Sequence, residues 1–171
     1  MQNFSRFLIW VTAVLILSLL LPMTLAAQES VILTEKELPG VVPAGFYFEG
    51  KSASTQMYNA TAVRFGEKRH VIAALVDTSG YATSVREKVE GFLIADLPFR
   101  IGGKELGVGT YAFGFTKEGM LNVFDLGGTS TLSVKATRDS GVRAPRPLSM
   151  VKGTDGIRLY RAKDYVIVST Q

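Results

Sequence analysis

The sequence has no cysteine and only one histidine among its 171 residues. Without cysteine the chain can form no disulfide, and it has no cleavage-site cysteine that could carry a lipid anchor. A histidine-based metal site needs more than one such ligand. A serine–histidine–aspartate hydrolase would have to use His70, and no G-x-S-x-G motif is present to partner it. These absences exclude several classes of enzyme and metal protein, and they leave the packed core as the source of stability.

Two short motif matches are also excluded by their context. Gly107–Ala112 fits the dinucleotide pattern G-x-G-x-x-A, but the residues that follow alternate as in a strand, and a phosphate site needs a helix there. Ser149–Lys152 fits S-x-x-K, but an extended segment turns these two side chains to opposite faces. The aspartates lie at expected strand ends, without calcium-ligand spacing. We therefore assign no catalytic residue, no metal site and no cofactor.

The first residues have the pattern of a signal peptide. Met1–Arg6 carries one positive charge, and Phe7–Leu21 is almost entirely apolar. This run is shorter than the roughly twenty residues of a spanning helix. We expect residues 1–27 to be a signal peptide cleaved after Ala26 or Ala27, which predicts a secreted or periplasmic protein without a membrane span after cleavage. An uncleaved N-terminal anchor is the alternative.

The rest of the chain has the pattern of an antiparallel β protein. His70–Val76 is a continuous apolar run, which predicts a central strand buried on both faces. Paired or single glycines at 102–103, 119 and 127–128 separate short alternating segments, as in hairpins. Residues 52–65 predict a long or bulged strand. The prediction is an all-β, mainly antiparallel single domain, a β-sandwich or barrel of about ten strands.

One short helix is expected near residues 83–89, with Thr83 or Ser84 as its cap and Arg86 facing outward. We interpret residues 28–42 as a linker or edge strand and residues 43–171 as the β-sandwich domain.

Basic residues gather in one segment. Residues 135–164 contain eight lysines and arginines but three aspartates. Such an excess can mark a footprint for an anionic partner, although solvated loops and strand edges, the interpretation we favour, carry the same charges. The segment lacks the interleaved aromatic residues that stack on bases, so we expect no nucleic-acid partner. Arg143 and Arg146 are kept as candidate binding residues.

A second polar group directly follows the central apolar run. Asp77, Thr78 and Tyr81, with Arg86 in the helix beyond, lie where a rigid strand would end in a loop. Loops held by rigid elements often carry binding sites, which makes these four residues binding candidates. The alternative is a helix start with a tyrosine that covers the core.

Four stretches carry a resemblance to known proteins: VVPAGFYFEG, HVIAALVDTSGY, IGGKELGVGTYAFGF and RPLSMVKGTDGIRLYRAKDYV. Together, from about Val41 to Val168, the chain resembles a family of uncharacterised secreted bacterial β-rich proteins with no assigned activity. The resemblance implies export and a compact β domain. It supplies no catalytic residues.

Three functions remain open. The first is an exported, non-catalytic β domain that binds a cell-envelope polymer, a protein partner or a small ligand, with exposed tyrosines as a platform. The second is a small cell-envelope hydrolase that uses carboxylates near Asp77. The third is a structural accessory subunit of an envelope complex. A pocket where Asp77, Tyr81 and Arg86 converge would favour a ligand or enzyme site, and a flat row of exposed aromatic residues would favour a polymer.

Overall fold

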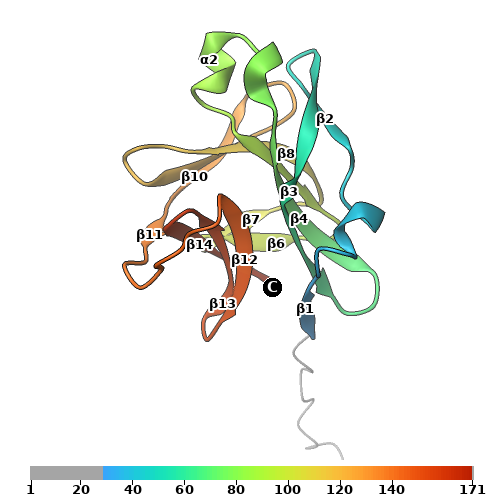
Figure 1. Ribbon diagram of the computed structural model, residues 1–171, viewed down its shortest axis with the longest axis vertical. Coiled ribbons are helices and arrows are strands. Elements are labelled where there is room, and N and C mark those ends of the chain that lie inside the picture. The colour runs from blue at the N-terminus through green and yellow to red at the C-terminus, as the bar shows by residue number, and fades with distance from the viewer. Residues whose placement is uncertain (1–28, 171) are drawn as a thin grey trace, which may run out of the picture.

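A computed structural model describes residues 29–170, and the expected signal peptide lies outside the described residues. Within residues 29–170 the chain forms fourteen strands, two short 3-10 helices and one α-helix of four residues (Figure 1). Neighbouring strands pair antiparallel in two sheets. The predicted all-β, sandwich-like fold is confirmed.

The larger sheet contains most of the first half of the domain. Its order is β1-β3-β4-β5-β8-β9-β10, and β2 pairs with the first part of β3. The strands are β1 (Ser30–Ile32), β2 (Gly45–Phe48), β3 (Lys51–Phe65), β4 (Arg69–Val76), β5 (Gly91–Ala95), β8 (Gly109–Phe115), β9 (Met120–Phe124) and β10 (Ser130–Lys135).

The smaller sheet contains the C-terminal strands and one hairpin from the middle of the chain. Its order is β12-β13-β14-β6-β7, and β11 pairs with β14. The strands are β6 (Phe99–Ile101), β7 (Lys104–Leu106), β11 (Thr137–Arg138), β12 (Leu148–Gly153), β13 (Gly156–Arg161) and β14 (Asp164–Thr170). Gly102 and Gly103 join β6 to β7 with positive φ at both residues, as the two-glycine hairpin predicts.

The main core lies between the two sheets. Val63, Val71 and Phe113 of the larger sheet and Phe99 and Leu159 of the smaller one have no exposed surface, and they belong to one contiguous apolar cluster. Thr61 in β3 is the one polar side chain counted as buried among residues 29–170, and its Oγ1 accepts a hydrogen bond from the Met150 amide of β12 at 3.1 Å. This bond ties the edge of the smaller sheet to the larger one.

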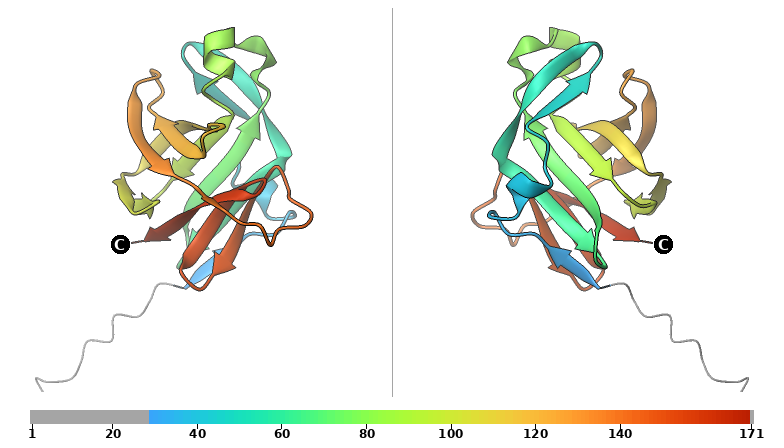
Figure 2. Two further views of the ribbon diagram at one scale, coloured as in Figure 1. Left: turned by 90° about the vertical axis from the view of Figure 1, so that its left-hand side faces the viewer. Right: turned by 90° about the vertical axis from the view of Figure 1, so that its right-hand side faces the viewer.

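A second apolar layer covers the outer face of the larger sheet. It is formed by the β2–β3 hairpin together with η1 (Leu38–Gly40), α2 (Thr83–Arg86) and Tyr81, which directly follows η2 (Thr78–Gly80). Figure 2 shows the hairpin and α2 at the end of the molecule opposite β1. Because the larger sheet is covered on both sides, β4 is buried from Val71 to Val76. The central strand predicted from the apolar run is confirmed.

The predicted helix is shorter than the sequence suggests. It ends at Arg86 and not at residue 89, and its N-cap is Ala82, so the expected caps Thr83 and Ser84 are wrong. After Arg86 the chain leaves the helix, and Val89 packs in the second apolar layer just before β5 begins. Tertiary packing therefore ends the helix before its local propensity does.

Candidate functional site

A large bulge interrupts β3 where it pairs with β4. Thr55 lies opposite Val76 and Ala60 opposite Ala74, so the four residues 56–59 face the single residue Leu75. Side chains alternate between the two faces of a strand, and the bulge adds three residues, an odd number. Odd-numbered residues before the bulge therefore lie on the face that even-numbered residues occupy after it. Ala53 before the bulge and Ala60 after it therefore pack in the same outer apolar layer.

Side-chain amides hold the bulge in shape. The Asn59 Nδ2 donates to the Gln56 Oε1 at 2.8 Å, and the Gln56 Nε2 donates to the Val76 carbonyl of β4 at 3.0 Å. Between these two residues, Met57 packs partly against the outer apolar layer. Tyr58 points outward, with 96% of its surface exposed. The bulge thus presents an aromatic side chain from a segment that is anchored on both sides.

A polar cavity of about 520 Å³ lies beside the bulge. Its volume is within the range of small-ligand sites, roughly 300–1,000 Å³. Six parts of the chain meet in it: the bulge, the end of β4, the η2–α2 segment, the residues just before β5, the residue just before β12 and the end of β13. The lining residues are Gln56, Asn59, Leu75, Val76, Thr78, Arg86, Val89, Glu90, Pro147 and Arg161.

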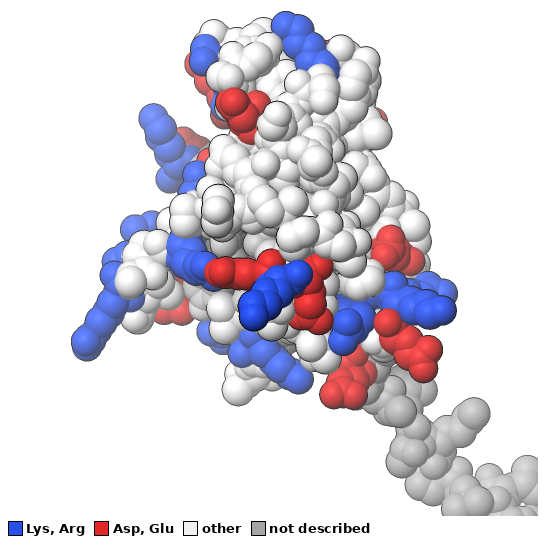
Figure 3. Space-filling model, turned by 45° about the vertical axis from the view of Figure 1, so that its right-hand side comes forward, with Lys and Arg blue, Asp and Glu red and all other residues white. Residues whose placement is uncertain are grey.

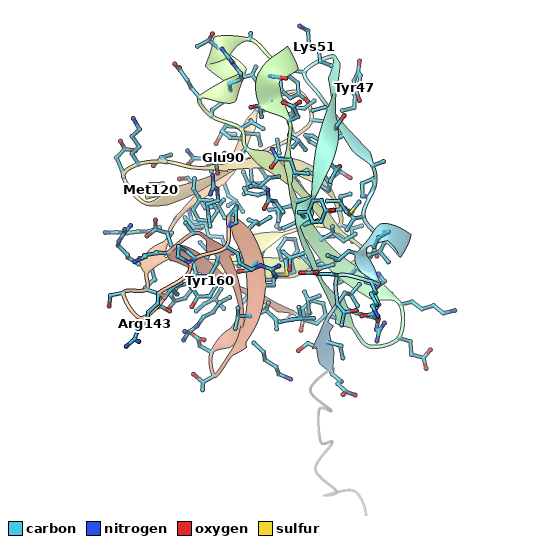
Figure 4. The ribbon with its side chains drawn as sticks, in the orientation of Figure 1. Tyr47, Lys51, Glu90, Met120, Arg143 and Tyr160 are labelled. Carbon is cyan, nitrogen blue, oxygen red and sulfur yellow. The ribbon has the colours of Figure 1, made fainter. Side chains whose placement is uncertain are left out.

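The floor of this polar cavity carries a fixed ion pair. Arg161 donates from Nε and Nη2 to the two carboxylate oxygens of Glu90, both at 3.1 Å, and from Nη1 to the Pro147 carbonyl at 3.2 Å. The backbone amide of Phe115 also donates to Glu90, at 3.3 Å. Both charged side chains are about 30% exposed. A guanidinium held by two parallel hydrogen bonds has a defined orientation, because the fork geometry of the pair allows little rotation. Figure 4 labels Glu90 among the side chains of this region.

A second cavity, of about 400 Å³, lies on the other side of the bulge. Leu38, Pro39, Met57 and Ala60 make it largely apolar, and Tyr58 forms part of its wall. Its rim is charged: Glu35 Oε1 accepts from the Nη2 of Arg146 at 2.6 Å, and Lys36 lies beside them. The bulge therefore forms a ridge between a polar and an apolar cavity, with Tyr58 exposed on it.

The candidate residues near the central strand separate into two groups. Thr78 and Arg86 line the polar cavity. Asp77 caps η2, accepting from the Ser79 amide at 3.0 Å, and this bond holds the pKa of its carboxyl below the ordinary value. Tyr81 is buried, and burial together with a nearby glutamate raises the pKa of its phenol. Its hydroxyl donates to the Lys51 carbonyl at 3.3 Å. The structure does not bring Asp77, Tyr81 and Arg86 together.

The two candidates from the basic segment also lie apart. Arg146 lies on the rim of the apolar cavity, whereas Arg143 is exposed on the connector before β12 and points away from Glu90 (Figure 4). The other three arginines of the segment pair with acidic side chains, including Arg138 with Asp164. Figure 3 shows both signs of charge interspersed over the lower half of the face it displays. This pairing agrees with the interpretation of the segment as solvated loops and edges.

The tyrosines do not form a flat row. Tyr47 on β2 is 62% exposed and Tyr58 is more so, while Tyr81 and Tyr160 are buried. Tyr47 and Lys51 lie together on the β2–β3 hairpin, away from Glu90 (Figure 4). Only one strongly exposed tyrosine, Tyr58, borders a cavity described above.

Four polar or charged lining residues are not predicted as site residues from the sequence: Gln56, Asn59, Glu90 and Arg161. The bulged strand was expected, and its polar residues were its only local signal. Glu90 and Arg161 are 71 residues apart, so no local pattern relates them.

Comparison with protein-family models, with curated proteins and with solved structures finds no match for this chain. The resemblance to secreted bacterial β-rich proteins therefore stays a prediction. No helix within residues 29–170 is long and apolar enough to cross a membrane.

Proposed function

We propose that the protein is an exported, non-catalytic binding domain of the cell envelope, and that it binds a glycan polymer across the bulge of β3. The observation that carries the proposal is Tyr58, which lies almost fully exposed on a fixed ridge between two cavities. An aromatic ring with one apolar face and a polar tip suits the apolar face and hydroxyl groups of a sugar ring.

The polar cavity suits the hydroxyl groups of such a ligand. The Gln56 and Asn59 amides each have donors and an acceptor, and Thr78 adds a hydroxyl. The apolar cavity on the other side of Tyr58 would accept the less polar face of a neighbouring unit. A chain that crosses the ridge would touch both, which favours an extended polymer over a single small molecule.

The alternative of a hydrolase near Asp77 receives less support. Glycoside hydrolysis ordinarily needs two carboxyl groups that flank the scissile bond. Among the residues that line the polar cavity, Glu90 is the only carboxylate, and both its oxygens accept hydrogen bonds from Arg161. Asp77 is engaged by the backbone of η2 and does not line the cavity.

The test is a glycan and envelope-fraction binding screen with the purified protein, followed by titration of Tyr58→Ala against the best ligand. We expect affinity to fall about tenfold, a change of about 1.4 kcal/mol. Tyr47→Ala is the matched control, because it removes an exposed tyrosine from β2. Folding stability should change by less than about 0.5 kcal/mol in both variants. Equal binding by Tyr58→Ala and the unaltered protein would refute the site, and product release from a glycan would favour the hydrolase.

A further inference from the structure

We infer that the polymer bound at the bulge is acidic, and that Arg86 and Arg161 bind a carboxylate of one of its sugar units in the polar cavity. This inference rests on the proposed function and adds the chemical class of the ligand. The first observation is the charge of the cavity. Arg86 and Arg161 line it, and Glu90 is the one acidic residue that lines it with them. The cavity thus carries one positive charge in excess.

The second observation is that Arg86 has no acidic partner among the residues that the structure describes. Six of the nine arginines within residues 29–170 form an ion pair with an aspartate or glutamate: Arg64, Arg100, Arg138, Arg146, Arg158 and Arg161. Arg69, Arg86 and Arg143 do not, and of these three Arg86 lines the polar cavity. Its Nη2 donates to the neutral Thr83 hydroxyl at 3.3 Å. A cation beside polar groups and without a counter-charge favours an anionic ligand.

The third observation concerns Arg161. A guanidinium has five N–H donors, and three of those of Arg161 are used, two on Glu90 and one on the Pro147 carbonyl. Two donors remain without a partner among residues 29–170. Glu90 and Pro147 already fix the guanidinium. The Arg161 side chain therefore loses little conformational entropy when a ligand accepts hydrogen bonds from these two donors. Glu90 is in this interpretation a positioning residue that orients Arg161.

The remaining lining residues define the rest of the ligand. Gln56, Asn59 and Thr78 are neutral and polar, which suits hydroxyl groups around the anion. A single excess positive charge is balanced by a monoanion. A planar carboxylate also matches the planar donor pair of a guanidinium. A uronic acid unit combines all of these features, because it carries one carboxylate on a ring with several hydroxyls. The formal net charge of +4, or +3 without Arg6 of the expected signal peptide, would also attract an acidic polymer over a distance.

The experiment compares three polymers by isothermal titration with the full protein. Polygalacturonate supplies carboxylates, its methyl ester supplies the same backbone without charge, and poly(glycerol phosphate) supplies phosphodiester monoanions. We expect polygalacturonate to bind at least about tenfold more tightly than the ester, since hydrogen bonds to charged groups are worth about 1.5–3 kcal/mol. Affinity for polygalacturonate should also fall as salt rises.

Two matched variants locate the contact. Arg86→Gln should weaken polygalacturonate binding about tenfold and leave binding of the ester unchanged, whereas Arg143→Gln, an exposed arginine on the connector, should change neither. If the acid and the ester bind equally, and Tyr58→Ala weakens both, the carboxylate inference is wrong and the proposed function stands. If poly(glycerol phosphate) binds more tightly than polygalacturonate, the assignment to a carboxylate is likewise overturned. If no polymer of this set or of the wider screen binds, the proposed function itself fails.

Discussion

Replacement of Thr61 by valine removes the hydrogen bond between the Met150 amide of β12 and the Thr61 hydroxyl of β3, and so measures its contribution to stability. Valine has nearly the shape of threonine but lacks the hydroxyl, so the Met150 amide would lose its acceptor at a buried position. A buried donor without a partner costs about 1–3 kcal/mol. For a domain of this size, each kcal/mol lowers the melting temperature by roughly 2–4 °C or slightly more. We therefore expect Thr61→Val to melt about 2–12 °C below the unaltered protein.

The assays are urea denaturation and amide hydrogen exchange. Urea denaturation gives the loss in the free energy of unfolding, and exchange at Met150 reports the bond itself. Thr61→Ser is the control, because it keeps the acceptor and loses one buried methyl group, worth about 1 kcal/mol. We expect fast exchange at Met150 in Thr61→Val and slow exchange in Thr61→Ser. Slow exchange in both variants, with equal stability, would refute the role given to this bond.

The same variant also tests how the site is built. Pro147 lies just before β12 and lines the polar cavity, so a loosened β12 would shift one wall of that cavity. If the proposed site is correct, Thr61→Val should weaken ligand binding although Thr61 touches no ligand. Unchanged binding together with lost stability would mean that the cavity does not depend on this edge.

Three further outcomes are expected. Glu90→Gln should lower the free energy of unfolding by about 1–2 kcal/mol in low-salt urea titrations, because a charged acceptor of several hydrogen bonds is lost, and a variant as stable as the unaltered protein would contradict this. Gly91→Ala places a Cβ against a backbone carbonyl of β4 and should cost about 1–3 kcal/mol, whereas Gly40→Ala, where the space is open, should cost less than about 0.5 kcal/mol by the same titration. Hydrogen bonds from the Tyr160 hydroxyl and a backbone amide depress the pKa of Asp139, so its contribution to stability is present above about pH 4 and is lost as pH falls through the lowered pKa. Denaturation at a series of pH values should therefore show a weaker acid dependence in Asp139→Asn, and an unchanged profile would show that this carboxyl does not contribute.

The sequence predicts the parts of the fold that depend on short-range pattern. The apolar run in β4 correctly indicates a strand covered on both faces, and the two glycines at 102–103 correctly mark a hairpin. The predicted C-terminal end of the helix is wrong because Val89 packs in the outer apolar layer. This packing involves residues distant in the sequence, so the local pattern does not indicate it. Ser149–Lys152 is correctly predicted to be extended, but its place beside β3, where Met150 bonds to Thr61 across 89 residues, has no local signal in the sequence.

The candidate site is predictable only in part, for the same reason. Thr78 and Arg86 could be found because they belong to the polar segment that follows a buried strand, and both line the polar cavity. Glu90 and Arg161 could not, because their pairing depends on how two sheets meet. Tyr58 is one of six tyrosines in the sequence, which composition alone cannot rank, and its exposure follows from the irregular register of β3 and β4.

The bulge of β3 has a consequence for how this protein can change over time or be redesigned. Residues 56–59 lie between two separately paired blocks of β3: Lys51–Ser54 pairs with β2 and Thr55 lies opposite Val76 of β4, whereas Ala60–Phe65 pairs with the rest of β4. Since each block is held by its own ladder, insertions or deletions among these four residues would reshape the outward ridge while the paired blocks keep their partners. If the proposed site is correct, changes in the length as well as the sequence of this segment would alter binding specificity, and the segment would be a suitable place to graft a different recognition loop.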